Sequence, residues 1–203
     1  MSRWRKIYLY VLVALVVGEM VLALGSWLYS AANPMSGIHS LLSSEGLRWL
    51  LGHFARVQAT PLLVWLVLLS MGVGCVCGSL NPADGDKKYT AIHSYRERRA
   101  LLLASALVLV YVGVILLLTL PPQAVLLSAS GGLWPSPFSA SLVPLTAFGL
   151  LLFGIVNGLV SGRFTSLSAV VDSLLSGIRT AAPLLLLYVL LIQFYESLRF
   201  VWP

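Results

Sequence analysis

Charged residues are scarce in this sequence, and their scarcity excludes a soluble fold. Asp, Glu, Lys and Arg make up only 10% of the residues, whereas soluble domains carry about 25%. No charged residue occurs between Ala100 and Gly162, a gap that is incompatible with a water-exposed surface. Because 59% of the residues are hydrophobic, the composition predicts an all-α integral membrane protein that crosses the lipid bilayer several times.

Cysteine and histidine are too few to form a disulfide framework or a metal site. We interpret the two cysteines, Cys75 and Cys77, as small residues buried in the membrane, and the three histidines, His39, His53 and His93, are scattered. No Ser/His/Asp or paired-carboxylate constellation occurs, so no enzyme activity is expected. The net charge of +6 would suggest nucleic acid in a soluble protein. In a membrane protein the placement of charges matters more than their sum, and no nucleic-acid partner is expected.

Five apolar segments are predicted to span the bilayer, which requires a helix of about 20 residues. The first follows three basic residues and is too long for the core of a cleavable signal peptide, so we interpret it as a retained helix. The last has only about a dozen strongly apolar residues and is marginal for a span. The five segments are approximately 7–28, 59–76, 100–120, 142–160 and 183–194.

Two shorter segments, 37–58 and 166–182, are too polar to span the bilayer alone. In the first, the apolar stripe restarts near Ser43 or Ser44, either of which suits a helix cap, and Glu45 suits the first turn. This pattern fits two short helices that meet at a break in a re-entrant hairpin, or one amphipathic helix at the membrane surface. In the second segment, apolar residues recur with helical spacing and polar residues lie opposite. We therefore expect two short re-entrant or interfacial helical segments beside the five spans.

The two short segments share a plan that suggests an internal repeat. Each leads into a proline and an apolar run, at Pro61 and at Pro183, and each contains Ser-Leu-Leu-Ser. Broken hydrophobic segments in corresponding positions of two halves indicate a secondary-transporter fold. Chance similarity between leucine-rich helices is the alternative. In the repeat interpretation, a single membrane domain consists of repeat-like units 1–80 and 121–203, a basic cytoplasmic loop, 81–99, and a connecting span, 100–120.

The positions of the basic residues predict the orientation of the chain. With the N-terminus in the cytoplasm, ten of the thirteen Lys and Arg residues lie inside, and the reverse orientation inverts this ratio. An odd number of crossings then separates the two copies, so they point in opposite directions, as an inverted repeat requires. We expect a multi-pass protein of the cell inner (plasma) membrane with a cytoplasmic N-terminus.

Two of the polar residues inside predicted spans stand out, Glu19 in the first and Asn157 in the fourth. An ionisable group at membrane depth costs a few kcal/mol or more and normally faces the protein interior or a wet cavity. Glu19 is therefore either a proton or cation site or a carboxyl bonded to a neighbouring helix. Asn157 either lines a pathway or makes an interhelical hydrogen bond.

Residues 40–49, residues 61–74 and several later stretches together resemble the p-aminobenzoyl-glutamate transporter (AbgT) family of inverted-repeat carriers. Residues 40–49, SLLSSEGLRW, are similar to the Ser-Gly-Glu-Gly-Ile/Leu-Arg-Trp segment that follows the first helix in that family. Residues 61–74 are similar to the apolar segment that comes next. The family's later helix, loop and second broken segment are matched by residues 120–122, 134–138, 143–145 and 182–194.

The resemblance implies a secondary transporter for p-aminobenzoyl-glutamate or a related organic anion, coupled to Na⁺ or H⁺ and without another cofactor. The chain departs from the family pattern, because family members are considerably longer, and the resemblance omits their middle block of Asn/Ser/Asp-rich helices and their C-terminal end. Residues 78–80 also lack the family's acidic residue. Because five spans hardly enclose a pathway, we expect a homodimer or a partner membrane chain. The alternative is a non-transporting, truncated member that acts as a membrane scaffold or as one half of a split carrier.

The candidate residues for the substrate or ion pathway come from these observations. Four of them match the family segment before the second span, and two belong to the second broken segment. No catalytic residue and no metal ligand is expected. The candidates are Glu19, Ser43, Glu45, Gly46, Arg48, Asn157, Pro183 and Gln193.

Overall fold

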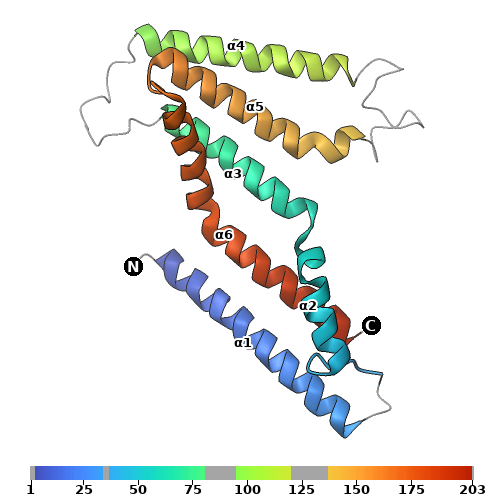
Figure 1. Cartoon of the computed structure of the whole chain (residues 1–203). Coiled ribbons are helices and arrows are strands. Elements are labelled where there is room, and N and C mark those ends of the chain that lie inside the picture. Colours follow the sequence, from blue (N-terminus) through green and yellow to red (C-terminus); the bar gives the residue numbers. More distant parts are fainter. Residues whose placement is uncertain (1–2, 34–36, 81–94, 120–136, 203) are drawn as a thin grey trace. The chain divides into compact units, whose positions relative to one another are not determined.

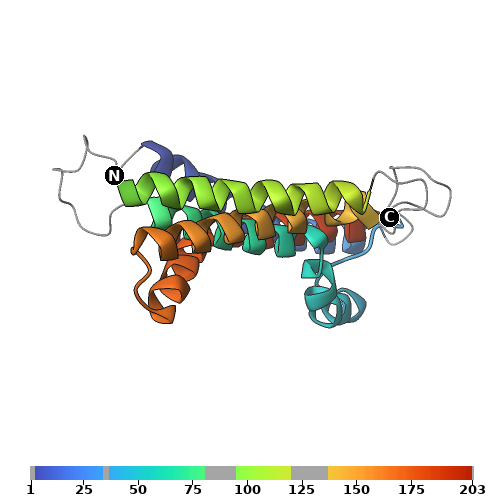
Figure 2. The same ribbon diagram turned by 90° about the horizontal axis from the view of Figure 1, so that it is seen from above.

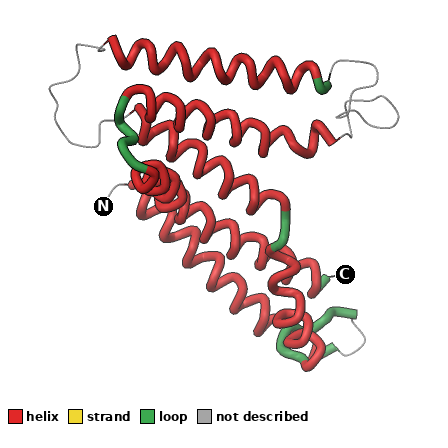
Figure 3. Tube along the Cα trace, turned by 45° about the horizontal axis from the view of Figure 1, so that its top comes forward, coloured by secondary structure: helices red, strands yellow, loops and turns green. Residues whose placement is uncertain are grey.

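The structure is a computed structural model that describes residues 3–33, 37–80, 95–119 and 137–202. Every regular element in these ranges is a helix, as Figure 3 shows. Five of the helices are long and apolar enough to cross a membrane, which confirms the predicted all-α membrane fold. The helices are α1 (Arg3–Ala32), α2 (Ser44–Gln58), α3 (Pro61–Leu80), α4 (Tyr95–Leu117), α5 (Pro137–Ser161) and α6 (Leu167–Val201).

The last helix, α6, joins two segments that the sequence pattern predicts to be separate. The amphipathic segment 166–182 and the apolar segment 183–194 belong to one helix of 35 residues, with Pro183 inside it. The expected break at Pro183 is therefore wrong, and in the described ranges α2 is the single short helix beside the five spans. A proline removes one backbone donor from the helical ladder, and the leucines that follow it are strong helix formers, so the helix continues through this position.

α4 and α5 begin earlier than predicted. α4 starts at Tyr95, so the end of the predicted basic loop is helical. Arg99 lies one turn further on, 4.2 Å above the centre of the Tyr95 ring, a spacing that stabilises a helical turn. α5 starts at Pro137 instead of Leu142, because proline suits the first position of a helix. The rest of the predicted basic loop, 81–94, lies outside the described residues.

The segment before the second span contains one helix instead of two. α2 covers residues 44–58, and residues 37–43 before it are not helical. A hairpin of two short helices is therefore wrong for this segment, and a single amphipathic helix agrees with the structure. The shared Ser-Leu-Leu-Ser motif lies in the turn before α2 in one copy and inside α6 in the other. The two copies thus differ in local structure, and the inverted repeat stays a prediction.

The helices labelled in Figure 1 form two compact units. Unit 1 consists of Met1–Leu63 and Pro183–Pro203, and unit 2 of Val64–Ala182. α3 and α6 therefore contribute to both units. The predicted repeat-like halves have other boundaries, but a compact unit is defined by packing and a repeat by internal symmetry, so the repeat is a separate question.

In unit 1, the second half of α6 packs against α1. Gly18 lies so close to Phe194 that an added Cβ would be 3.2 Å from the phenylalanine ring. Further along both helices, Ser26 and Val201 line the same cavity. The contacts advance in the same direction along both helices, so α1 and this part of α6 are parallel. The first and fifth of five successive crossings must be parallel in this way.

α2 packs on the same half of α6 but runs antiparallel to it. The Trp49 ring stacks on the Phe200 ring with centroids 4.5 Å apart. Towards the other end of α2, Gln58 Nε2 donates to the Val189 carbonyl oxygen at 3.2 Å. These contacts fix the second half of α6 from a second side.

In unit 2, small residues allow other helices to approach α3 closely. A Cβ on Gly177 of α6 would lie 2.0 Å from the Ser70 carbonyl oxygen, and a Cβ on Gly74 would lie 2.5 Å from the Gly177 Cα atom. On another side, a Cβ on Gly154 of α5 would lie 2.8 Å from Cys75 Sγ. Small residues spaced by four positions are typical of membrane helix pairs, where packing replaces the hydrophobic effect.

α4 lies beside α5 in unit 2, as Figures 1 and 2 both show. The Tyr111 hydroxyl donates to the Leu145 carbonyl oxygen at 3.0 Å, and its ring lies 5.5 Å from that of Phe148.

Of the two cysteines of α3, Cys75 is buried and Cys77 is exposed on the helix surface.

Candidate functional site

The predicted residues at the start of α2 have local structural roles. Ser43 Oγ accepts a hydrogen bond from the Gly46 backbone N–H at 3.0 Å and donates to the Ser40 carbonyl oxygen at 2.7 Å. This is the helix cap that the sequence predicts. Gly46 is buried beneath the turn, where a Cβ would lie 2.3 Å from the Ser40 carbonyl oxygen. The side chains of Glu45 and Arg48 are exposed.

A first polar cluster, the glutamate cluster, joins α1 to the second half of α6 and consists of Glu19, Gln193 and Ser197. Ser197 Oγ donates to Glu19 Oε1 at 2.6 Å, and Gln193 Nε2 donates to Ser197 Oγ at 3.2 Å. Ser197 is fully buried, and it lies four residues after Gln193 on the same face of α6. The structure thus brings together two candidates that are far apart in the sequence.

The turn between α5 and α6 positions a second polar cluster. Gly162 has a φ of 78°, the left-handed conformation that ends many helices, and its N–H donates to the Leu159 carbonyl oxygen at 3.1 Å. Phe164 is buried against Gly158, where a Cβ would lie 2.1 Å from the phenylalanine ring. The turn is therefore fixed on both sides of Arg163.

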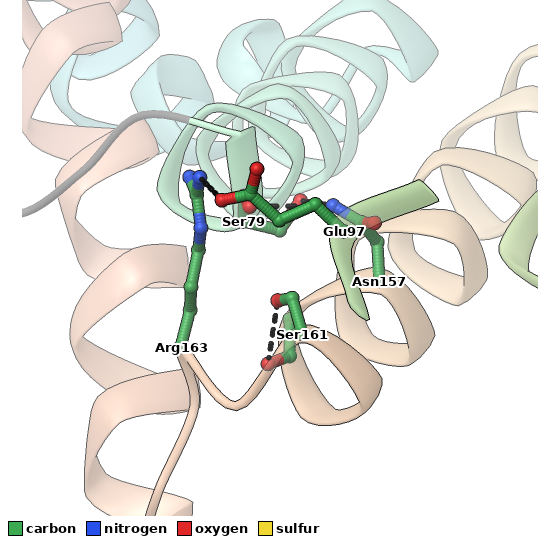
Figure 4. Close-up of polar contacts among 6 residues, drawn as sticks. Ser79, Glu97, Asn157, Ser161 and Arg163 are labelled. Atoms are coloured by element: carbon green, nitrogen blue, oxygen red, sulfur yellow. Dashed lines mark hydrogen bonds and ion pairs between the residues drawn. The ribbon is translucent and has the colours of Figure 1, made fainter. Parts of the chain in front are cut away.

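This second cluster, the arginine cluster, is formed by the C-terminal ends of α3 and α5, the first turn of α4 and the turn after α5. It consists of Ser79, Glu97, Asn157, Ser161 and Arg163. Arg163 Nη2 donates to Glu97 Oε1 at 3.1 Å. Asn157 Nδ2 donates to the Ser79 carbonyl oxygen at 3.2 Å. Figure 4 shows the Arg163 side chain reaching the Glu97 carboxylate beside the pair of Ser79 and Asn157. Asn157 thus makes the interhelical hydrogen bond that was one of its two predicted roles.

The arginine cluster lines a small polar cavity of about 60 Å³. Arg163 Nη1 is buried and has no hydrogen-bond partner among the described residues. A guanidinium nitrogen without an acceptor is a strong donor, and its natural partner is an anion or water. The cluster therefore offers one free N–H donor to water or to an anion, beside a guanidinium charge that Glu97 already balances.

The remaining candidate, Pro183, is exposed on α6 where the chain passes from unit 2 to unit 1. A proline here leaves the carbonyl oxygen of Arg179 without its usual helical donor. Pro183 is thus placed by the structure in neither polar cluster.

Five members of the two clusters are not among the residues predicted from the sequence: Ser79, Glu97, Ser161, Arg163 and Ser197. In the sequence, Arg163 contributes only to the prediction of the chain's orientation in the membrane, and Glu97 belongs to the predicted basic loop. The order of the spans contained a usable signal, because consecutive crossings place the end of the second span, the start of the third and the end of the fourth at one membrane face. Ser197 offered only its spacing of four residues from Gln193.

Comparisons with known proteins agree with this architecture. Residues 74–201 match the model of the AbgT putative transporter family. No curated protein matches the chain. Among solved structures, the crystal structure of the Alcanivorax borkumensis YdaH transporter is similar with a TM-score of 0.73 and 15% sequence identity. That likeness covers 94% of this chain and 70% of the YdaH chain, and at such low identity it concerns the fold. The family match includes the arginine cluster, whereas the SLLSSEGLRW segment lies outside it.

Proposed function

We propose that this chain, which belongs to the AbgT putative transporter family, carries p-aminobenzoyl-glutamate or a related organic anion across the membrane by cation-coupled secondary transport. The chain is a multi-pass membrane protein, and its family points to a transporter instead of an enzyme. The inner membrane, the cytoplasmic N-terminus and the coupling to Na⁺ or H⁺ are parts of the same proposal.

The observation that carries the anion part of the proposal is the unpaired Nη1 of Arg163 in the arginine cluster. A glutamate-like solute bears carboxylates, and Nη1 of Arg163 can donate a charge-assisted hydrogen bond to one of them while Nη2 stays bonded to Glu97. A cavity of about 60 Å³ admits a carboxylate but not the whole solute, so we propose that it holds one end of the anion. Glu97 would fix the orientation of the guanidinium through its bond to Nη2.

Uptake by reconstituted protein tests this proposal. Labelled p-aminobenzoyl-glutamate is added to the buffer outside the proteoliposomes, and uptake by the wild type is compared with uptake by Arg163→Lys. This variant keeps the positive charge but cannot bind both Glu97 and a carboxylate in the same geometry. Uptake is expected to fall roughly tenfold or more, as for loss of a hydrogen bond to a charged group. The matched control is Arg179→Lys, on the exposed surface of α6, which should leave uptake unchanged. Wild-type uptake by Arg163→Lys would refute the role of Arg163.

The second proposal is a non-transporting role, as a membrane scaffold or as one half of a split carrier. One observation favours it: 70% of the YdaH chain is covered by the likeness, so part of that transporter has no counterpart in this chain. We propose for either role that the chain works as a homodimer or with a partner membrane chain. Absence of flux from a folded, reconstituted dimer, together with a co-purifying membrane partner that restores uptake, would favour the split carrier.

A further inference from the structure

Two buried oxygen atoms of the glutamate cluster lack a hydrogen-bond partner among the described residues: Oε2 of Glu19 and Oε1 of Gln193. The hydroxyl of Ser197 has a single hydrogen, which it donates to Glu19 Oε1 at 2.6 Å. The Ser197 oxygen then accepts from the Gln193 amide nitrogen at 3.2 Å, which leaves the amide oxygen unused. The cluster therefore has two acceptors that no described donor reaches.

The glutamate cluster also lacks a positive charge. Among the described residues, one ion pair occurs, between Arg163 and Glu97 in unit 2. Glu19 has no basic residue as an ion-pair partner in these ranges. An ionised carboxylate at membrane depth is costly unless a positive charge compensates it. A positive charge that binds to oxygen would supply what each of the unpaired atoms requires.

Packing holds the glutamate cluster in place before any ligand arrives. Ser197 is fully buried between the helices. Next to the cluster on both helices, Gly18 admits the Phe194 ring, and one turn along α6 the Phe200 ring is stacked on Trp49. A ligand would meet oxygen atoms already fixed in position, so little ordering is needed on binding.

Two other titratable side chains around this half of α6, those of His39 and Glu196, lie against other groups. The His39 ring contacts Phe200, with centroids 5.5 Å apart. Glu196 lines a separate pocket with His53 and Arg56 of α2. Glu196 is therefore a matched control for Glu19, because it is a second carboxylate of unit 1 outside the glutamate cluster.

We propose that the glutamate cluster binds one monovalent cation, delivered as Na⁺ or as a proton, through Glu19 Oε2 and Gln193 Oε1. A single carboxylate with neutral oxygens suits one positive charge, whereas divalent cations such as Ca²⁺ use six to eight oxygen ligands. The proposal rests on the proposed function, for which it supplies the site of the coupling cation. The coupling cation would thus bind in unit 1, whereas the arginine cluster belongs to unit 2.

Thermal unfolding of the purified full chain tests cation binding without any transported solute. The protein is placed in choline buffer, and Tm is measured while Na⁺ replaces choline at fixed pH, and then across pH 6 to 8 without Na⁺. A cation that binds the folded state raises Tm in a saturable manner. A response to Na⁺ identifies sodium, and a response only to lower pH identifies a proton.

Glu19→Gln and Gln193→Leu should abolish the response, and Glu196→Gln should retain it. Glu19→Gln supplies an amide donor without a charge, so in choline its Tm should equal or exceed that of the wild type. If Glu19→Gln does not fold, Gln193→Leu provides the same test. A wild-type Tm that responds to neither cation, or a full response in the two cluster variants, would overturn the proposal. Because no solute is present, these outcomes are separate from a failure of p-aminobenzoyl-glutamate uptake.

Discussion

Gly177→Ala should loosen the contact between α3 and α6 that forms the centre of unit 2. The new Cβ would lie 2.0 Å from the Ser70 carbonyl oxygen and 2.8 Å from the Gly74 Cα atom. Both are backbone atoms, so no side-chain rotation relieves the overlap. Ordinary contact begins at 3.4 Å, so the helices must separate locally by about 1.4 Å, the difference between 3.4 and 2.0 Å. Overpacking of this kind costs about 1–3 kcal/mol.

The matched control is Gly113→Ala on α4, where no atom lies within 4 Å of the new Cβ. Both variants gain the higher helix propensity of alanine, which is about 1 kcal/mol, so the difference between them isolates the packing cost. For a chain of this size, about 1–3 kcal/mol corresponds to a Tm difference of roughly 2–12 °C. The assay is thermal unfolding of both variants in the same detergent. Equal Tm values would show that α3 and α6 do not approach each other at Gly177, and would refute the packing described for unit 2.

Two further predictions concern unfolding measured in the same way. Gly46→Ala should destabilise the chain by about 1–3 kcal/mol, because its Cβ would lie 2.3 Å from the Ser40 carbonyl oxygen, whereas Gly52→Ala, with open space around it, should not. Equal Tm values for these two variants would contradict the cap geometry. Asn157→Leu should lower stability by about 1 kcal/mol through loss of the interhelical bond to Ser79. An unchanged Tm would show that the bond contributes nothing in the folded protein.

Most of the fold was predictable because membrane spans obey a simple physical requirement. In hydrocarbon, every backbone group must be satisfied within its own helix, so a long apolar run has one available structure. The start of α2 was also predictable, since Ser43 and Glu45 satisfy the free N–H groups of a helix end locally. These two rules need no knowledge of tertiary contacts.

The bounds of α6 were not predictable from the same rules. Pro183 and the amphipathic stretch before it read as a break, because helix propensity and periodicity are local properties. The structure continues the helix, and the first half of α6 packs through Gly177 against α3. Tertiary packing therefore outweighs one missing backbone hydrogen bond. The Ser-Leu-Leu-Ser motif likewise takes its local structure from its context, because it lies in a turn before α2 and in a helix within α6.

The site was predictable only in part, because its members are contributed by separate helices. Glu19 stood out as a carboxylate within an apolar run, and Asn157 as an amide within another. Ser197 carries no local signal that distinguishes it from other serines. Its importance comes from the parallel packing of α1 and α6, which places its hydroxyl 2.6 Å from Glu19 Oε1.

Within the part of the chain that the structure describes, the glutamate cluster lacks a further hydrogen-bond donor and the arginine cluster lacks a further acceptor. This difference argues for two different ligands. The glutamate cluster leaves two oxygen acceptors unpaired, and the arginine cluster leaves one nitrogen donor unpaired, among the described residues. Each cluster is formed within its own unit. An unpaired buried carboxylate lowers stability, so Glu19→Gln should stabilise a chain that serves only as a scaffold. In a carrier the same replacement should raise Tm in ligand-free buffer and abolish coupled uptake. A stabilised Glu19→Gln variant that still shows cation-coupled uptake would contradict this argument.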